Sequence, residues 1–303
     1  MDFKARHVLF SRRRGGLNGN GAKEKKMARS KKCELSDRMF AHRTELNNIA
    51  DGRHDKANEE TVTIDEVVSF LQMSASNHKR VYRYTNIDRV KEILSSKRLA
   101  LSRLLEMNDL REFQDVKDAD RTYIACFSFG ELENMAMWWM YGRDSEKSVR
   151  ISFNNQKVGL CVARLKDKEG VFRDPDGKEP MGAHLIDTVS YHDIAYVYGK
   201  ALMWNHKVVG MSRCRKLDYP KKQEELHGFI KDYGWSSENE VRLMVKLKKC
   251  DPDLKRIFID FSEAVKSMEV LTGPVNDKHT KIKGLLSMYD VKSVEKSQAS
   301  VIF

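Results

Sequence analysis

Three segments of this chain contain residue types and spacings that can do chemistry. Arg83 stands between two tyrosines, Ser128 follows a Cys-Phe pair, and Glu238 and Glu240 are two residues apart. A planar guanidinium can bind a phosphate through two parallel hydrogen bonds. Two carboxylates at positions i and i+2 of a strand point to the same face. The pattern therefore predicts an anion-binding arginine and a carboxylate pair brought to a common site.

Motifs of several other enzyme classes do not occur in the sequence. It contains no Walker loop, no G-x-G-x-x-G, no H-E-x-x-H and no G-x-S-x-G. Its five cysteines are far apart and form no C-x-x-C pair, so we expect reduced thiols and neither a zinc site nor a disulfide framework. The histidines lack ligand spacing, and we expect no metal.

The first half of the chain predicts elements that position Arg83 and Ser128. Residues 81–85 are aromatic and β-branched, which is typical of a strand. Asn86 can cap a helix over 87–94, which has apolar residues at helical spacing. We also expect helices from Thr63 and over 131–141, and strands over 99–102, 122–129 and 148–153.

The second half predicts the element that holds the acidic pair. Residues 240–247 alternate as a strand, and we expect further strands over 256–260 and 268–271 and a helix over 278–288. The polar stretch 154–185 is interpreted as irregular, and 200–232 as a helical stretch interrupted near Pro220. Strands and helices mix without a regular βαβ rhythm, which favours an α+β fold with a mostly antiparallel sheet.

Charge and composition predict two regions. Residues 1–33 hold eleven Lys or Arg against two acidic residues, a net +9, whereas the remainder carries only +2. We expect residues 1–60 to be a basic, disordered tail and 61–303 to be a single α+β domain. Such a tail binds DNA or RNA backbones without reading sequence. The alternative is a leader without function, or a true start at Met27.

Location follows from what the sequence lacks. No run of eighteen apolar residues occurs, and the N-terminus has no apolar signal region. We therefore expect a cytoplasmic protein with no membrane partner.

From Val81 onward the chain resembles the bacterial domain-of-unknown-function family twenty-nine seventy-one. The shared features cover about three quarters of the chain, and no activity follows from that family's name. They are Tyr82–Tyr84, Asn108-Asp109, Cys126–Ser128, Trp138–Tyr141, Trp235–Arg242 and Leu271–Pro274.

A second resemblance is to ADP-ribosyltransferases, the DNA-targeting toxins in particular. Residues 82–94 are similar to the opening of those enzymes, and Arg83, Ser128 and Glu238-x-Glu240 follow the order of their Arg–Ser–Glu class. Ser128 departs from that pattern, because it lies in Cys-Phe-Ser-Phe instead of Ser-Thr-Ser. The resemblance implies an ADP-ribosyltransferase-like fold with a split, mostly antiparallel sheet and flanking helices.

The same resemblance implies NAD as the substrate and a role for each site residue. Glu240 would stabilise the oxocarbenium-like transition state at the ribose. Glu238 would orient or deprotonate the acceptor, and Arg83 would bind phosphate. Ser128 would bond to ribose or to Glu240. Aromatic rings would enclose the nicotinamide, with Tyr84 paired with Trp138 or Trp235.

Each residue also has an ordinary structural interpretation. Glu238, Glu240 and Arg242 can form a charge ladder on a strand surface. Arg83 can be an exposed strand residue and Ser128 a satisfied core hydroxyl, while the Met- and Trp-rich helix can simply pack in the core.

The function predicted by resemblance is transfer of ADP-ribose from NAD to nucleic acid or protein, in a toxin or phage-defence setting. The alternatives are a non-catalytic module that binds a nucleotide or nucleic acid, and an NAD glycohydrolase.

Overall fold

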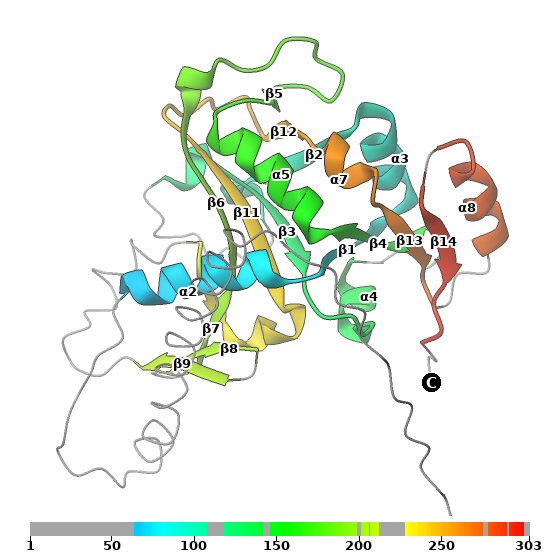
Figure 1. Ribbon diagram of the computed structural model, residues 1–303, viewed down its shortest axis with the longest axis horizontal. Helices are drawn as coiled ribbons and strands as arrows, with labels where there is room; N and C mark the ends of the chain where they lie inside the picture. Colours follow the sequence, from blue (N-terminus) through cyan, green and yellow to red (C-terminus); the bar gives the residue numbers. More distant parts are fainter. Residues whose placement is uncertain are drawn as a thin grey trace, which may run out of the picture. The chain divides into compact units, whose positions relative to one another are not determined.

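A computed structural model describes most of the chain beyond residue 63 (Figure 1). The described residues are 64–107, 118–141, 146–198, 201–205, 207–211, 228–274, 278–289 and 291–299. The basic tail, Thr63 and the Asn108-Asp109 turn lie outside these ranges, so the expectations about them remain predictions. Among the described residues, no helix is both long enough and apolar enough to cross a membrane.

Ten of the described strands form one sheet, in which the pairs are antiparallel except for β13 with β14. The order is β14-β13-β4-β1-β3-β2-β12-β5, and β11 pairs with β3 and with β6. The strands are β1 Arg80–Asn86, β2 Arg98–Arg103, β3 Thr122–Ser128, β4 Ser148–Asn154, β5 Val171–Phe172, β6 Ile186–Asp193, β11 Glu240–Leu247, β12 Arg256–Asp260, β13 Glu269–Thr272 and β14 Ser293–Lys296. The expected α+β fold with a mostly antiparallel sheet is confirmed.

The sheet forks between β1 and β3. β1 pairs with β4 at seven positions but with β3 only at Tyr82↔Ser128. From that point β1 and β3 diverge, and the far end of β3 pairs with β2 through Ser102↔Ile124 and its neighbour. A split in the sheet was expected, and its position between β1 and β3 is set by this single shared register point.

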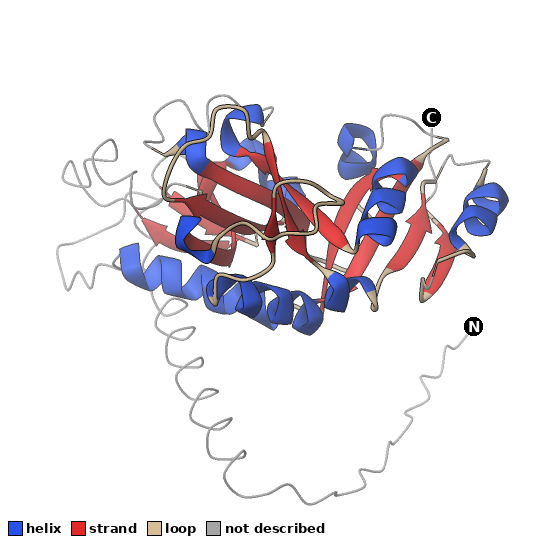
Figure 2. Cartoon of the chain, turned by 90° about the horizontal axis from the view of Figure 1, so that it is seen from above, coloured by secondary structure: helices blue, strands red, loops and turns tan. Residues whose placement is uncertain are grey.

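Helices cover the sheet and bury its apolar face. α2 Ile64–Asn77 and α5 Asn155–Lys166 pack against β6 and against each other, and α7 Ser262–Val265 packs on α5 (Figures 1 and 2). The apolar residues of β11 enter the core beneath them, because alternate strand residues point to opposite faces. The structure also describes the α-helices α3 Ile87–Ser96, α4 Met135–Tyr141 and α8 His279–Leu286.

Several local signals in the sequence correspond to the observed elements. The β11 strand has the predicted bounds, and the Asn86 side chain accepts a hydrogen bond from the Arg89 backbone at 3.0 Å, so Asn86 caps α3 as expected. Residues 155–166, expected to be irregular, are instead the helix α5. Asn154 caps this helix, and Val158, Val162 and Leu165 lie on its buried face.

The helix expected over 200–232 is wrong wherever the structure describes that range. A second sheet of order β10-β7-β8-β9 stands there, with strands β7 Ala195–Tyr198, β8 Ala201–Trp204, β9 Lys207–Met211 and β10 Ile230–Asp232. Register pairs Tyr198↔Ala201 and Trp204↔Lys207 leave only two residues between successive strands, the length of a tight hairpin connection. Asn205 supports the second turn by adopting a left-handed φ of 46°.

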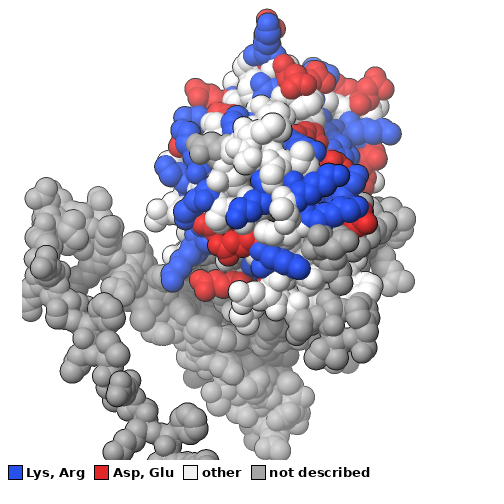
Figure 3. Space-filling view, turned by 90° about the vertical axis from the view of Figure 1, so that its right-hand side faces the viewer, with Lys and Arg blue, Asp and Glu red and all other residues white. Residues whose placement is uncertain are grey.

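The surface around α8 mixes both signs of charge (Figure 3). Lys278 pairs with Glu146, Lys292 pairs with Glu269 at 2.7 Å, and Lys147 pairs with Asp88 at 3.1 Å. These pairs agree with the small net charge of the chain beyond residue 33.

Candidate active site

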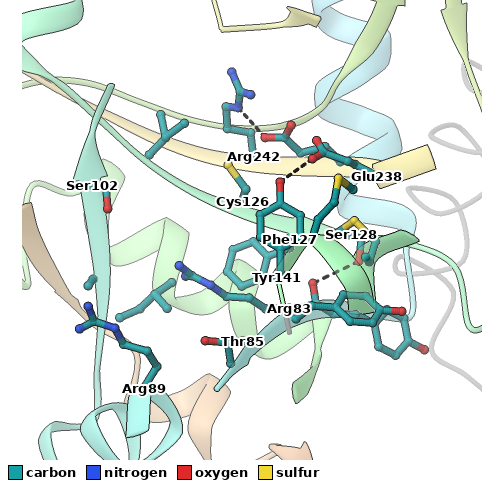
Figure 4. A pocket seen from close by; sticks show the side chains of 18 of the residues that line it. Arg83, Thr85, Arg89, Ser102, Cys126, Phe127, Ser128, Tyr141, Glu238 and Arg242 are labelled. Carbon is teal, nitrogen blue, oxygen red and sulfur yellow. Dashed lines mark hydrogen bonds and ion pairs between the residues drawn. The ribbon is translucent and has the colours of Figure 1, made fainter. Parts of the chain in front are cut away.

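A pocket of about 800 Å³ occupies the fork of the sheet (Figure 4). Its walls come from β1, β2, β3, α3, α4 and β11, together with the short helix η5, Tyr233–Glu238. The fork creates this space because β1 and β3 share only one register point and then separate. The volume falls within the range of roughly 300–1,000 Å³ that is typical of small-molecule sites.

Strand register places the acidic and basic groups of β11 and β3 on one face. Glu240 lies opposite Ser128 and Arg242 lies opposite Cys126. Directly opposed residues of an antiparallel pair point to the same side, so all four face the pocket, whereas Val241 and its alternate neighbours enter the core.

The carboxylates belong to a buried network of charges. The Arg242 Nε donates to Glu240 Oε1 at 2.8 Å. The Lys231 Nζ donates to Glu238 Oε2 at 2.7 Å and lies 3.3 Å from Glu240 Oε2. The Tyr141 hydroxyl donates to Glu238 Oε1 at 2.5 Å. Glu238, Glu240 and Arg242 are at most 3% exposed. The interpretation of these residues as a charge ladder on a strand surface is therefore wrong.

The network gives the two carboxyl groups different proton affinities. Burial raises the pKa of Glu238, and the charge of Glu240 raises it further. Burial also acts to raise the pKa of Glu240, but the charges of Arg242 and Lys231 outweigh it and hold that pKa below the usual value. When the pKa values of two neighbouring carboxyl groups differ in this way, one group can stay ionised while the other exchanges a proton.

Glu238 does not lie on the strand that carries Glu240. It ends η5, and Asn239 then adopts a left-handed φ of 44° before β11 begins. The expectation that both carboxylates share one strand face is therefore wrong, since the turn at Asn239 breaks the alternation. They meet instead through Lys231, which comes from β10 of the second sheet.

The Arg83 side chain projects into the fork and lines the pocket (Figure 4). Within the described part of the chain it makes no hydrogen bond or ion pair, although part of its side chain is accessible from the pocket. Burial lowers the pKa of its guanidinium, which stays protonated at neutral pH. A desolvated guanidinium facing an open pocket is suited to an anionic ligand.

Three more arginines line the same pocket, at the end formed by α3, β2 and β12. Arg89 pairs with Glu92 at 2.6 Å, and Arg256 is exposed. Arg98 donates to the backbone carbonyls of Asp174, Pro175 and Gly177. In all, the described lining contains six Lys or Arg against three Glu. This excess of positive charge favours a ligand with phosphate groups.

The predicted aromatic residues divide between the core and the pocket. Trp138 is buried outside the pocket lining, where its Nε1 donates to Glu133 at 3.0 Å and its ring meets Tyr84 edge-on at 4.9 Å. Tyr84 lines the pocket but is only 6% exposed. Trp235 lines the pocket and lies beneath the Lys231 ammonium, 4.9 Å from the ring centre.

Ser128 and Cys126 lie beside the acidic network. The Ser128 hydroxyl lines the pocket and lies 3.5 Å from the Tyr82 carbonyl oxygen, a weak contact that leaves it able to bond elsewhere. Burial raises the pKa of the Cys126 thiol and the charge of Glu240 raises it further. A thiol in that state is not a nucleophile at neutral pH.

Sequence reasoning missed several residues of the pocket besides its arginines. Tyr141 and Lys231 complete the carboxylate network, and Trp139, 66% exposed, lines the pocket beside Tyr141. The segments Trp138–Tyr141 and Trp235–Arg242 were singled out in the sequence, but each of these side chains meets a partner from a distant segment. Across the described ranges, no group of three His, Cys, Asp or Glu side chains is arranged to hold a metal.

Comparisons with known proteins find remote structural likeness only. No family model matches the chain, so membership of family twenty-nine seventy-one is not confirmed, and no curated protein matches. Two solved structures of DarT from Thermus sp. 2.9 are similar, one in complex with NAD+ and one in complex with carba-NAD+. The first is 12% identical with a TM-score of 0.33, covering 73% of this chain and 96% of its own. The second is 13% identical with a TM-score of 0.32, covering 73% and 97%.

Proposed function

We propose that this protein transfers ADP-ribose from NAD to a macromolecular acceptor. The observation that carries the proposal is Glu240, a buried carboxylate kept ionised by Arg242 and Lys231 at the wall of a pocket that also holds Arg83. A permanent negative charge and an anion-binding cation in one pocket match the nicotinamide ribose and the diphosphate of NAD, both of which the reaction must hold.

The carboxylate of Glu240 suits the bond that breaks. When the ribose C1′–nitrogen bond of NAD opens, its electron pair goes to the nicotinamide nitrogen and positive charge develops on the ribose. A fixed negative charge in a water-poor site stabilises that charge without reorganising. Glu240 is 2% exposed, and hydrogen bonds from Arg242 and Lys231 fix its carboxylate in place before the reaction begins.

Arg83 and the arginine-lined end of the pocket suit the rest of NAD. The diphosphate carries negative charge, and a guanidinium binds phosphate oxygens through paired hydrogen bonds. Ser128 lies opposite Glu240 in the strand register, where it can bond to the ribose. Trp235 at the pocket wall offers a ring face beside the carboxylates.

Glu238 suits the acceptor side of the reaction. The acceptor supplies a lone pair to C1′ and loses a proton, and a carboxylate with a raised pKa is a better base than an ordinary one. Within this proposal the acceptor is nucleic acid or protein, the enzyme is cytoplasmic, and the setting is toxicity or phage defence.

The test is incubation with NAD labelled in the adenylate moiety together with bacterial DNA, RNA and protein. Release of nicotinamide with label on one of these fractions supports transfer. Release with free ADP-ribose alone supports an NAD glycohydrolase, and NAD binding without release supports a non-catalytic module. Either of the last two results would overturn the proposal.

The matched variants are Glu240→Gln and Glu263→Gln. Glu263 pairs with Lys266 at 2.6 Å on the surface and does not line the pocket, so its variant should behave like the parent protein. Glu240→Gln should lose about 10²–10³ in turnover, the usual cost of removing one electrostatic contact to a transition state.

A further inference from the structure

Glu238 and Tyr141 differ sharply in their access to the pocket. Glu238 is 3% exposed, and its carboxylate accepts a hydrogen bond from Lys231 on one oxygen and from Tyr141 on the other. Tyr141 is 42% exposed and lines the pocket, with its hydroxyl directed at Glu238 (Figure 4). An acceptor in the pocket therefore meets the phenol before it meets the carboxylate.

We propose that Tyr141 is a catalytic residue that relays the acceptor's proton to Glu238. The inference rests on the proposed function and adds a residue and a direction of proton flow to it. The acceptor's O–H or N–H group contacts the Tyr141 oxygen, which has lone pairs free to accept while its own hydrogen is donated to Glu238.

The relay balances as one concerted step. The acceptor's lone pair forms the bond to ribose C1′ as the bond to the nicotinamide nitrogen breaks. The acceptor's proton passes to the Tyr141 oxygen, and the Tyr141 proton passes to Glu238 Oε1. Tyr141 ends as it began, a neutral phenol, and Glu238 ends protonated. The 2.5 Å separation of the phenol and carboxylate oxygens is short enough for this transfer.

The geometry of Tyr141 is fixed by the start of its own helix. Asn134 caps α4 by accepting from the Met137 backbone at 3.3 Å, and its side-chain amide donates to the Ser237 carbonyl beside Glu238. The Asn134 backbone also donates to the Tyr84 hydroxyl at 2.9 Å. These contacts connect α4 to β1 and η5, so the helix that carries Tyr141 is hydrogen-bonded directly to the helix that carries Glu238.

A purely structural role for Tyr141 makes different predictions from a relay. If the phenol only stabilises the Glu238 carboxylate, its loss should lower the melting temperature and NAD affinity along with turnover. A relay concerns only the transfer step, so NAD affinity and KM should stay near the parent values. The decisive measurements therefore separate kcat from KM.

The experiment compares Tyr141→Phe, Glu238→Gln and the double variant with the parent protein, and Tyr289→Phe serves as the control outside the pocket. The substrates are labelled NAD and whichever bacterial fraction the parent modifies. Tyr141→Phe should lower kcat for labelling by about 10², within the range for general-base groups, with KM for NAD unchanged. The double variant should be no slower than the slower single variant, because both residues serve one proton path.

A second substitution at position 141 distinguishes loss of the hydroxyl from a folding defect. Incorporation of 3-fluorotyrosine at position 141 keeps the hydroxyl and the ring, and should restore most of the labelling rate. Parent-like labelling by Tyr141→Phe, or multiplicative losses in the double variant, would overturn the relay alone. Absence of NAD turnover in the parent would overturn the proposed function and the relay with it.

Discussion

At the scale of single residues, two buried carboxylates of the site are paired with two cations. Glu238 and Glu240 face Lys231 and Arg242, and the groups are nearly inaccessible to water. Buried ion pairs repay their desolvation only with good geometry, and removing one partner leaves an uncompensated charge. Burying these charges lowers the stability of the fold. A functional site accounts for that cost, whereas packing of the core does not require buried charges.

Arg83→Ala should weaken NAD binding more than it weakens the fold. The guanidinium makes no hydrogen bond or ion pair within the described residues, so truncation removes no native polar contact there. A lost charge-assisted contact to phosphate is worth roughly 1.5–3 kcal/mol, or about 10–150-fold in affinity. Calorimetric titration with NAD and a thermal melt decide the matter. Unchanged affinity with a large drop in melting temperature would make Arg83 structural.

Lys231→Met should move the acidic limb of the pH–rate profile to higher pH. In the proposed function Glu238 is the base, so the rate should rise as pH passes upward through its pKa. Burial already raises that pKa, and the Lys231 charge and hydrogen bond oppose the rise. Without Lys231 the carboxyl needs a higher pH to ionise. The measurement is kcat against pH for parent and variant, and an unmoved limb would argue against Glu238 as the base.

At the scale of elements, the pocket depends on how two strands separate and on how one helix begins. β1 and β3 share the Tyr82↔Ser128 register point and then part, which opens the fork. α4 starts at the Asn134 cap and delivers Tyr141 to the opposite wall. Neither element holds the site alone, because Lys231 arrives from the second sheet.

Asn134→Ala should lower both stability and transfer. The substitution removes the cap of α4, which typically costs about 1 kcal/mol, and also the bond to the Ser237 carbonyl. The loosened helix should place Tyr141 less accurately, with a loss in kcat that exceeds any change in NAD affinity. Asn154→Ala, which removes the comparable cap of α5 outside the pocket, is the matched variant for the stability term. Equal effects of both variants on kcat would contradict a specific role for α4.

At the scale of the whole molecule, positive charge is divided unevenly along the chain. Nine of the eleven net charges fall in residues 1–33, while the described surface around α8 pairs opposite charges (Figure 3). The proposed site lies entirely at or beyond Tyr82. The proposed function therefore predicts that NAD chemistry and any binding of nucleic acid belong to different parts of the chain.

Deletion of residues 1–33 should reduce affinity for DNA or RNA and flatten its dependence on salt. The reason is that each phosphate contact by a basic residue releases counterions, and the deletion removes most of the excess charge. Nicotinamide release without an acceptor should be unchanged. The assays are nucleic-acid binding at two salt concentrations and nicotinamide release, on the same truncated protein. Loss of NAD turnover would place part of the site in the tail, and retained salt-sensitive binding would place the acceptor surface on the remainder.

The sequence by itself determined the elements that depend on near neighbours. The alternation of 240–247 predicted β11, Asn86 predicted the start of α3, and Arg83 was correctly placed on a strand between two tyrosines. These features arise from the two-residue period of a strand and from a cap that bonds three residues ahead, both of which are visible in a short window.

Only the tertiary structure decided which side chains meet. Trp138 and Tyr141 lie on the same short helix, yet one packs into the core and the other reaches Glu238. The turn at Asn239 takes Glu238 off the strand of Glu240, and Lys231 rejoins the two carboxylates from another sheet. The physical reason is that strand pairing and ion pairing act between segments far apart in the chain, so the energy that selects these partners is absent from any local pattern.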